Sequence, residues 1–236
     1  MLGIIGAMDK EVDMLAAEMT DAAEETIGYN RFYRGRLHGV PVCLARCGVG
    51  KVHAALCAAV MIREMGVDAV LNVGVAGALD ERLRIGDVVV ADSAVQHDVD
   101  TTPLGDPLGM VSGPDMIYFP CDGALRALLD RAAAAAGLTA LHAAVATGDQ
   151  FVAAEEQQDF LRRYYGAAAC DMEGGAIAQT CYEMGVPYAA CRAISDTRRG
   201  DGREYMEKAR IACLREQALV RAFMALYAEN GRHEHG

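Results

Sequence analysis

Short apolar segments that resemble β-strands alternate with helical segments along the whole chain. A strand at 1–7 precedes a helix at 9–19, and a helix at 51–65 precedes a strand at 68–73. Apolar runs of this length between segments of helical periodicity are typical of strands joined by crossover helices. The alternation therefore predicts an α/β protein rather than an all-helical or all-β one.

A hairpin signal near the N-terminus modifies this expectation. Residues 29–37 and 40–46 form two strand-like runs around His38 and Gly39, which indicates an antiparallel pair. Parallel crossovers combined with a hairpin produce a mixed sheet. We therefore expect a three-layer α/β/α fold with a central mixed β-sheet.

The second half of the chain continues the alternation and contains one long interruption. Strands are expected at 86–96, 141–147, 166–170 and 186–195, and helices at 122–137, 155–164, 173–184 and 203–227. Residues 97–120 hold four prolines and separate two of these elements. Loops of this length are usually functional or reach a neighbouring subunit, although a plain surface excursion is the alternative. No repeat or linker divides the chain, so we expect one domain over 1–236 with a polar tail at 230–236.

Composition narrows the class of protein. The chain is 53% hydrophobic and 23% charged, which fits a packed globular domain, and no apolar run reaches the ~18 residues of a membrane helix. The opening residues have no secretory-signal pattern, so we expect a cytoplasmic protein. A formal net charge of −11 without a basic stripe argues against nucleic acid as a partner.

Neither a metal site nor a bound cofactor is expected. The eight cysteines lie mostly in apolar segments, as reduced buried thiols do. Cys43 and Cys47 are four residues apart, but no second pair or histidine cluster has metal-ligand spacing. Gly3-Ile-Ile-Gly6 and Gly48-Val-Gly50 lack the full dinucleotide fingerprint, and no P-loop is present.

Three acids stand at the ends of expected strands: Glu11, Glu173 and Asp196. Because the carboxyl ends of strands border the ligand crevice of layered α/β proteins, these side chains suggest acid/base chemistry on a neutral, polar small molecule. Each also has a structural explanation. Glu11 and Glu173 suit the first turn of a helix, and Asp196 suits a helix cap.

Six segments together resemble one known family. They are Gly3–Val12, Cys47–Val52, Leu71–Gly77, Thr147–Phe151, Asp171–Glu173 and Arg192–Asp196. In order and spacing they are similar to the bacterial methylthioadenosine/S-adenosylhomocysteine nucleosidases over nearly the whole chain. The resemblance implies a nucleoside phosphorylase-like fold, a homodimer, a place in methionine salvage, and hydrolysis of the bond between adenine and a 5′-thio-substituted ribose.

The resemblance also implies catalytic roles. Hydrolysis requires a proton on the leaving adenine and a water molecule directed at a sugar that becomes cationic. By resemblance, Asp196 protonates adenine N7 with Ser195 orienting it, and Glu11 activates the water. Asp196 must hold its proton near neutral pH, so we expect a raised pKa. Arg192 helps to hold the water, unless it forms a purely structural ion pair.

Substrate-binding positions follow in the same way. By resemblance, Glu173 accepts hydrogen bonds from the ribose hydroxyls and Met172 packs against the ribose face. The remaining implied substrate contacts are Ala76, Gly77, Phe151, Val152 and Tyr205. Phe151 is expected to stack on adenine, although a core position is its alternative. Tyr205 is expected as a lid aromatic, although it equally suits a first-turn core position.

The segment 97–120 differs from the common version of the family. In the family this loop helps to form a pocket, supplied by the partner subunit, for the 5′ substituent. Leu104, Leu108 and Met116 are the expected apolar residues of that pocket. Val75 also replaces a common serine, and Asp171 replaces the usual glutamate.

Several related functions remain open. A phosphorylase needs cationic donors for phosphate, whereas Glu11 and Asn72 occupy the two candidate loops, so hydrolysis is favoured. An adenine nucleosidase for aminofutalosine or 5′-deoxyadenosine would use the same acids. A non-catalytic nucleoside-binding protein could also keep this set of residues.

Overall fold

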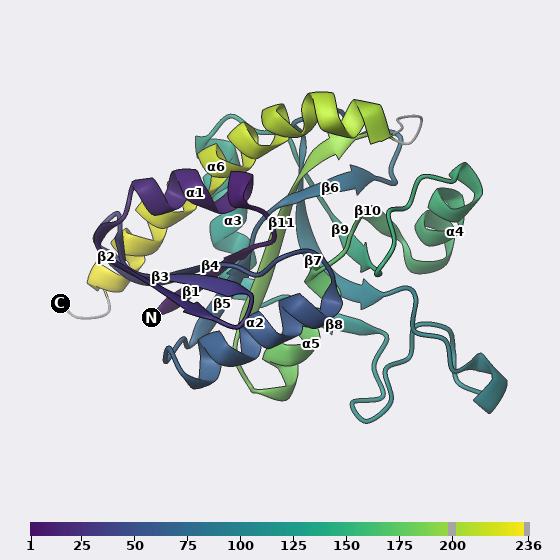
Figure 1. Cartoon of the computed structure of the whole chain (residues 1–236). Helices are drawn as coiled ribbons and strands as arrows, with labels where there is room; N and C mark the ends of the chain where they lie inside the picture. Colours follow the sequence, from purple (N-terminus) through teal and green to yellow (C-terminus); the bar gives the residue numbers. More distant parts are fainter. Residues whose placement is uncertain (198–201, 234–236) are drawn as a thin grey trace.

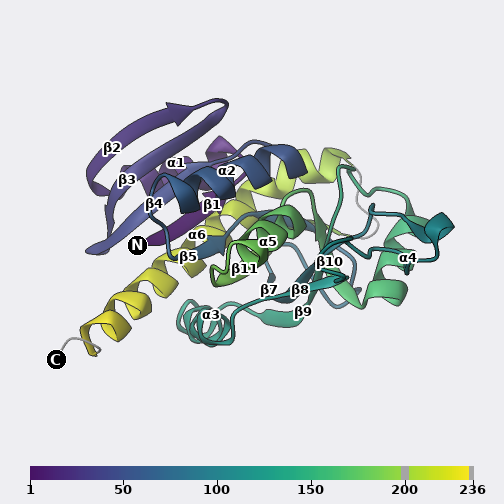
Figure 2. The same cartoon turned by 90° about the horizontal axis from the view of Figure 1, so that it is seen from below.

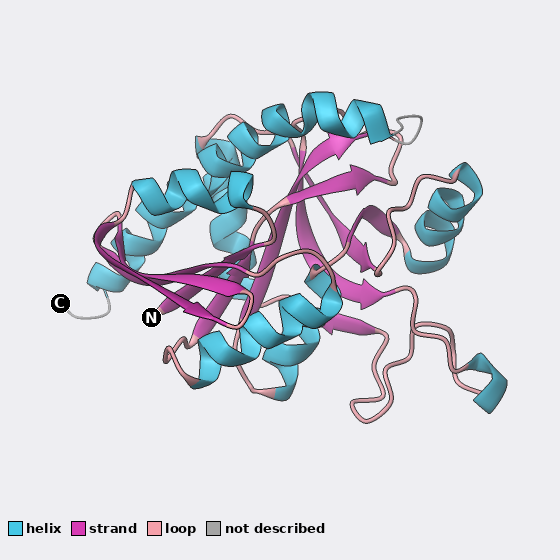
Figure 3. Ribbon diagram, viewed as in Figure 1, coloured by secondary structure: helices cyan, strands magenta, loops and turns pink. Residues whose placement is uncertain are grey.

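The computed structural model describes residues 1–197 and 202–233, with side chains over 1–197 and 208–230. In this part of the chain one mixed sheet runs in the order β2-β3-β4-β1-β5-β11-β6-β10-β9-β7-β8 (Figures 1 and 3). The strands are β1 Leu2–Gly6, β2 Thr20–Ile27, β3 Asn30–Leu37, β4 Val40–Arg46, β5 Ala69–Asn72, β6 Val75–Ala78, β7 Val88–Gln96, β8 Tyr118–Pro120, β9 Ala140–Thr147, β10 Ala167–Asp171 and β11 Tyr188–Asp196. The predicted α/β fold with a mixed sheet is confirmed.

Part of the sheet closes on itself. The strand β11 pairs in parallel with β6 and also in antiparallel fashion with β7. Because β6 pairs with β10, β10 with β9, and β9 with β7, these five strands form a closed ring. The C-terminal ends of β10 and β11 are thereby held beside β6. Both Cys170 and Asp196 pair with Gly77 of β6.

Helices cover the sheet. They are α1 Asp9–Ala17, α2 Lys51–Arg63, α3 Gly123–Ala135, α4 Glu155–Tyr165, α5 Gly174–Glu183 and α6 Gly202–His233, with a short 3-10 turn η1 at Thr102–Leu104. Figure 2 shows α2 and α5 lying side by side. None of the described helices combines the length and the apolar character that crossing a membrane requires.

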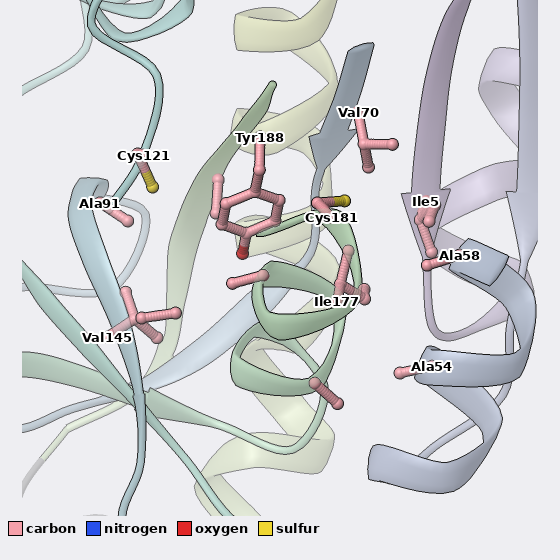
Figure 4. Close-up of a cluster of buried hydrophobic side chains, with 14 of the residues drawn as sticks. Ile5, Ala54, Ala58, Val70, Ala91, Cys121, Val145, Ile177, Cys181 and Tyr188 are labelled. Atoms are coloured by element: carbon pink, nitrogen blue, oxygen red, sulfur yellow. The ribbon is translucent and has the colours of Figure 1, made fainter. Parts of the chain in front are cut away.

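Two large hydrophobic clusters hold the helices against the sheet. In β1, Leu2 and Ile4 join the cluster that includes α3 and α6, whereas Ile5 joins the cluster that includes α2 and α5. Successive residues of a strand point to opposite faces, so both faces of β1 are buried. Figure 4 shows the second cluster, in which Ile177 and Tyr188 lie close together. Their burial removes apolar surface from water, which is the main source of stability.

The predicted hairpin is correct, and its turn explains why. His38 and Gly39 both have positive φ, 50° and 81°, as a two-residue turn with the right-handed strand twist requires. The neighbouring strand β2 was missed by sequence reasoning. Its residues are almost all exposed, so the apolar alternation that identifies a half-buried strand is lacking.

Three further differences concern short or exposed elements. β8 has only three residues, within the stretch predicted as a long loop, and β6 has only four, in a stretch for which no element was predicted. The helix α6 continues to His233, six residues beyond the expected end, so 230–233 are helical rather than a tail. Glu229 and Asn230 are exposed, so they carry no apolar periodicity that would extend the helix beyond its predicted end.

Candidate functional site

Glu11 is a buried carboxylate held by backbone donors. It follows the turn between β1 and α1 and is 2% exposed. Its Oε2 accepts hydrogen bonds from the N–H groups of Ala7 (2.8 Å) and Met8 (2.9 Å), and Oε1 accepts one from Val75 N–H (3.2 Å). Burial raises the pKa of Glu11, and these bonds together with the charge of Arg192 oppose that rise.

Glycine at position 74 makes this arrangement possible. Gly74 has φ 150°, and a Cβ there would lie 3.2 Å from Glu11 Oε1. A side chain at this position would therefore push the carboxylate away and strain the backbone. The approach of β6 to Glu11 consequently depends on Gly74.

Asp196 ends β11, the strand next to β6 in the sheet. It is 6% exposed, and Ser195 Oγ donates to its Oδ1 over 2.7 Å. The register shifts between Ile194 and Asp196, so that Asp196 pairs with Gly77. A Cβ on Gly77 would lie 3.0 Å from Asp196 Oδ2. The bulge thus directs the aspartate toward the β6 backbone, where a glycine leaves room for it.

The strand β6 connects these two acids. Glu11 binds the N–H of Val75, and Asp196 lies against Gly77. Two residues of a strand span about 7 Å, so both carboxyl groups contact one short stretch of backbone. Ala76, between the contact points, is buried and its carbonyl lies 3.3 Å from Ser195 Oγ.

Glu173 stands at the start of α5, directly after β10. It is 9% exposed, and its Oε1 accepts a hydrogen bond from Gly50 N–H over 2.8 Å. Burial and the charge of Asp171 raise the pKa of Glu173 to about 8, although Gly50 and Arg192 lower it and Glu11 raises it further. After burial itself, Cys57, Glu173 and Glu11 also raise the pKa of the buried Cys47 thiol. Glu11 therefore acts electrostatically on both Glu173 and Cys47.

Arg192 makes contacts of a structural kind. Its Nη2 lies 2.6 Å from Asp171 Oδ2, and its Nε donates to the same oxygen over 2.9 Å. The guanidinium also donates to the carbonyl of Asn72 over 3.1 Å and to its side-chain oxygen. Burial alone would lower the pKa of Arg192, but Asp171 raises it. These contacts match the structural alternative, while the charge of Arg192 still acts on Glu11.

Sequence reasoning missed the role of Asp171, which binds Arg192 beside the site acids. Asp171 stood out only as a departure from the family pattern, yet it also accepts from Thr147 Oγ1 over 2.5 Å and from Gly174 N–H over 3.1 Å. The presence of an arginine in a buried strand was the available signal, because such a charge needs an acidic partner. Its partner was identifiable only from the fold.

The expected base- and ribose-binding residues lie in different environments. Val152 is buried, Met172 is half-buried and Phe151 is 52% exposed. The alternative of a core position for Phe151 is therefore wrong. Tyr205 belongs to α6, but its side chain lies outside the described part of the structure.

The three residues expected in the 5′ pocket do not share a hydrophobic cluster. Leu104, in η1, is 83% exposed. Leu108 packs against the cluster that includes Leu161, and Met116 packs against the cluster of α2 and α5. Among residues 1–197 and 202–233, no group of three or more His, Cys, Asp or Glu side chains has an arrangement suited to a metal ion.

Comparisons with known proteins identify the family of the chain. The profile of the phosphorylase superfamily matches residues 1–225. A 5′-methylthioadenosine/S-adenosylhomocysteine nucleosidase of Staphylococcus aureus is 35% identical over 218 residues, covering 90% of this chain and 95% of that protein. The chain belongs to this nucleosidase family.

Solved structures show the same fold as this nucleosidase-family chain. The nucleosidase of Neisseria meningitidis, in complex with methylthio-immucillin-A, superposes with a TM-score of 0.90 at 34% identity, covering 94% of this chain and 97% of that one. The futalosine hydrolase of Helicobacter pylori also has a TM-score of 0.90, at 32% identity, covering 95% and 97%. Proteins with different named substrates therefore share this architecture.

Proposed function

We propose that this member of the family hydrolyses the N-glycosidic bond of 5′-methylthioadenosine and S-adenosylhomocysteine. The products are adenine and the 5′-thio-substituted ribose. The observation that carries the proposal is the placement of Glu11 and Asp196 against the same stretch of β6, at Val75 and Gly77. Val75 and Gly77 are about 7 Å apart along the strand, so the two carboxyl groups contact neighbouring points of one stretch of backbone, as a pair of acids acting on one bond requires.

The two acids have complementary tasks in this reaction. Asp196 delivers a proton to adenine N7, and the hydrogen bond from Ser195 holds its Oδ1 so that the other oxygen faces the base. Glu11 accepts a proton from the attacking water as that water approaches the sugar. Its three backbone donors keep the carboxylate oriented. Because Arg192 is held by Asp171, it acts on Glu11 through its charge.

The substrate contacts divide between sugar and base. Glu173 accepts hydrogen bonds from the ribose hydroxyls, and Met172 packs against the ribose face. Positive charge that develops on the sugar favours the ionised form of Glu173, so this contact strengthens toward the transition state. Phe151, with its exposed ring, stacks on adenine, and the main chain of Val152 contacts the base edge. Ala76 and Gly77 provide backbone alongside the nucleoside, and Tyr205 covers it.

We also infer a homodimer. Val52, Leu56 and Met184 are 70%, 57% and 39% exposed and line one groove between α2 and α5. Apolar surface of this kind favours a protein partner. Part of the segment 97–120 extends beyond the body of the molecule (Figure 1), which suits delivery of the exposed Leu104 to the neighbouring subunit's 5′ pocket. Leu108 and Met116, which pack partly against their own subunit, complete the proposed pocket residues.

The finer structural and cellular expectations belong to the same proposal. Helices against both faces of β1 support a three-layer α/β/α arrangement. A nucleosidase for adenine thioethers has a place in methionine salvage in the cytoplasm, and the proposed chemistry uses protein side chains and water.

Release of adenine from a panel of nucleosides tests the proposal. The panel contains 5′-methylthioadenosine, S-adenosylhomocysteine, 5′-deoxyadenosine and aminofutalosine, each with and without inorganic phosphate. We expect adenine from the first two at a rate independent of phosphate. Strict dependence on phosphate would establish a phosphorylase instead, and binding without adenine release would establish a nucleoside-binding protein.

A futalosine-type nucleoside is the second candidate substrate. The similarity to the futalosine hydrolase of Helicobacter pylori favours it, at 32% identity and a TM-score of 0.90. The two candidates share an adenine or purine leaving group and differ in the 5′ substituent. A kcat/KM for aminofutalosine above that for both thioethers would replace the first candidate by the second.

A further inference from the structure

Two neighbouring N–H groups at the start of α2 bind two different acids. Gly50 N–H donates to Glu173 Oε1, and Lys51 N–H donates to Asp149 Oδ1, each over 2.8 Å. The first acid belongs to the segment after β10 and the second to the segment after β9. The beginning of α2 is therefore attached to both strand ends at once.

The side chain of Lys51 closes a ring of hydrogen bonds. Its Nζ lies 2.6 Å from Asp98 Oδ1, with the two side chains 19% and 15% exposed. Asp98 Oδ2 in turn accepts from Asp149 N–H over 2.9 Å. Burial alone would raise the pKa of Asp98, but the bonds from Lys51 and Asp149 hold it below its usual value. A mostly buried pair of this kind is stronger than a surface ion pair.

The backbone at Gly50 is adapted to this ring. Its φ is 100°, and a Cβ there would lie 3.1 Å from Asp149 Oδ1. A glycine thus lets the helix start pass close to the aspartate. The position of the Gly50 N–H is set by the groups on either side of it. One of these is Glu173, and the other is the ring of hydrogen bonds through Lys51, Asp98 and Asp149.

We propose that Lys51, Asp98 and Asp149 are positioning residues, which hold the Gly50 N–H against Glu173 and thereby control recognition of the ribose hydroxyls. This inference rests on the proposed function, in which Glu173 binds those hydroxyls. Glu173 is the acid that needs the support, because its surroundings contain Asp171 and Glu11 as like charges. A displaced Gly50 N–H would leave Glu173 free to turn away from the sugar.

Substrates that lack one ribose hydroxyl provide the test. The variants are Lys51→Met and Asp98→Asn, and the measurements are kcat and KM for 5′-methylthioadenosine and for its 2′-deoxy and 3′-deoxy analogues. We expect kcat/KM for the full substrate to fall about 10- to 100-fold, as for loss of a charge-assisted hydrogen bond. Each analogue lacks one of the hydroxyls that Glu173 binds, so with the analogues the loss should shrink to less than about 3-fold.

A matched ion pair elsewhere serves as the control. Arg126 of α3 lies 2.7 Å from Asp92 of β7, with the two side chains 33% and 42% exposed. Asp92→Asn also removes the acid of a pair with a helix residue, and it should change kcat/KM for every substrate by less than about 2-fold. Lys51→Arg retains the charge and should recover most of the activity that Lys51→Met loses.

The outcomes separate this inference from the proposed function. Equal losses for all three substrates, or no loss in Lys51→Met, overturn the positioning role while leaving an active nucleosidase. If Lys51→Met fails to fold, the comparison is made with Asp98→Asn and Asp149→Asn. A wild-type protein that releases no adenine refutes the proposed function. In that case calorimetric affinities for the same three nucleosides still decide whether the variants act through the ribose hydroxyls.

Discussion

Asp171 and Arg192 form an ion pair whose side chains are only 1% and 2% exposed. The pair links the end of β10 to β11. Glu173 follows Asp171 by two residues, and Asp196 follows Arg192 by four. The buried contact therefore sets the distance between the strand ends that carry two of the three site acids.

Removal of one partner of this pair should destabilise the fold strongly. Asp171→Ala leaves the Arg192 charge buried without its acid, which costs about 3–5 kcal/mol. The control is Asp80→Ala, whose partner Arg82 is 74% exposed, and it should cost less than about 1 kcal/mol. Urea unfolding measures both. Similar losses in the two variants would show that the burial of the Asp171 pair is unimportant.

Glu11→Gln should abolish turnover and leave the fold intact. Glutamine keeps the shape of the side chain but is too weak a base for water, so kcat should fall by at least about 10³-fold. Asp13→Asn on the same helix changes an acid that is 58% exposed and should leave kcat unchanged. Adenine release and thermal denaturation are measured for both. An active Glu11→Gln protein would remove the proposed base.

Ser195→Ala should affect the chemical step more than substrate binding. The hydroxyl of Ser195 fixes the Asp196 carboxyl through a 2.7 Å hydrogen bond, so its loss should lower kcat about 10-fold with little change in KM. Ser93→Ala in β7 is the control for removal of a hydroxyl. Steady-state kinetics separate the two parameters. A rise in KM at constant kcat would instead indicate a binding role for Ser195.

Glu216→Gln should make stability less dependent on pH. Glu216 is 1% exposed, and neither carboxyl oxygen has a hydrogen-bond partner among the described residues. Burial and the charge of Glu11 raise its pKa well above 4.5, while Arg192 lowers it. The folded state thus keeps a proton that the unfolded state releases, so the stability contributed by Glu216 is full below about pH 4.5 and is lost as pH rises toward the folded-state pKa.

Urea unfolding at pH 5 and pH 8 checks this expectation. Over that window the wild type should lose up to about 1.4 kcal/mol per pH unit more than Glu216→Gln, because the variant has no proton to retain. Glu64→Gln, at an exposed position, should retain the slope of the wild type. Equal slopes in wild type and Glu216→Gln would mean that Glu216 is ionised in the folded protein.

Leu56→Glu should dissociate the proposed homodimer. The side chain is 57% exposed in the groove between α2 and α5, and a carboxylate there must be desolvated on association. Leu214→Glu in α6, where leucine is 45% exposed, is the control and should leave the mass unchanged. Light scattering gives both masses. A wild-type monomer at all concentrations contradicts the dimer, and a dimeric Leu56→Glu protein excludes this face.

The sequence predicted the elements with strong apolar patterns. The helix Gly123–Ala135 begins after the expected cap Asp122, whose side chain accepts from Leu125 N–H. The strand Tyr188–Asp196 was visible because its residues are all buried. β2 was missed because its residues are exposed, and β6 was missed because it has only four residues. Local pattern identifies only the strands that have a buried face and sufficient length.

The candidate acids were visible for a different reason. Glu11, Glu173 and Asp196 stand at strand ends and within motifs that resemble a known family, so their types and approximate locations could be read from the chain. Their partners are distant in sequence. Glu11 binds Val75, 64 residues away, and Glu173 binds Gly50, 123 residues away.

By itself, the sequence determined the alternation of strands and helices, the mixed sheet and the three acids, because these depend on periodicity and residue type over short stretches. Only the tertiary structure decided that Glu11 and Asp196 both contact β6, that Asp171 neutralises Arg192, and that α2 begins against Glu173. Each of these depends on how strands pair and close, and such pairing is set by the packing of segments that lie far apart along the chain.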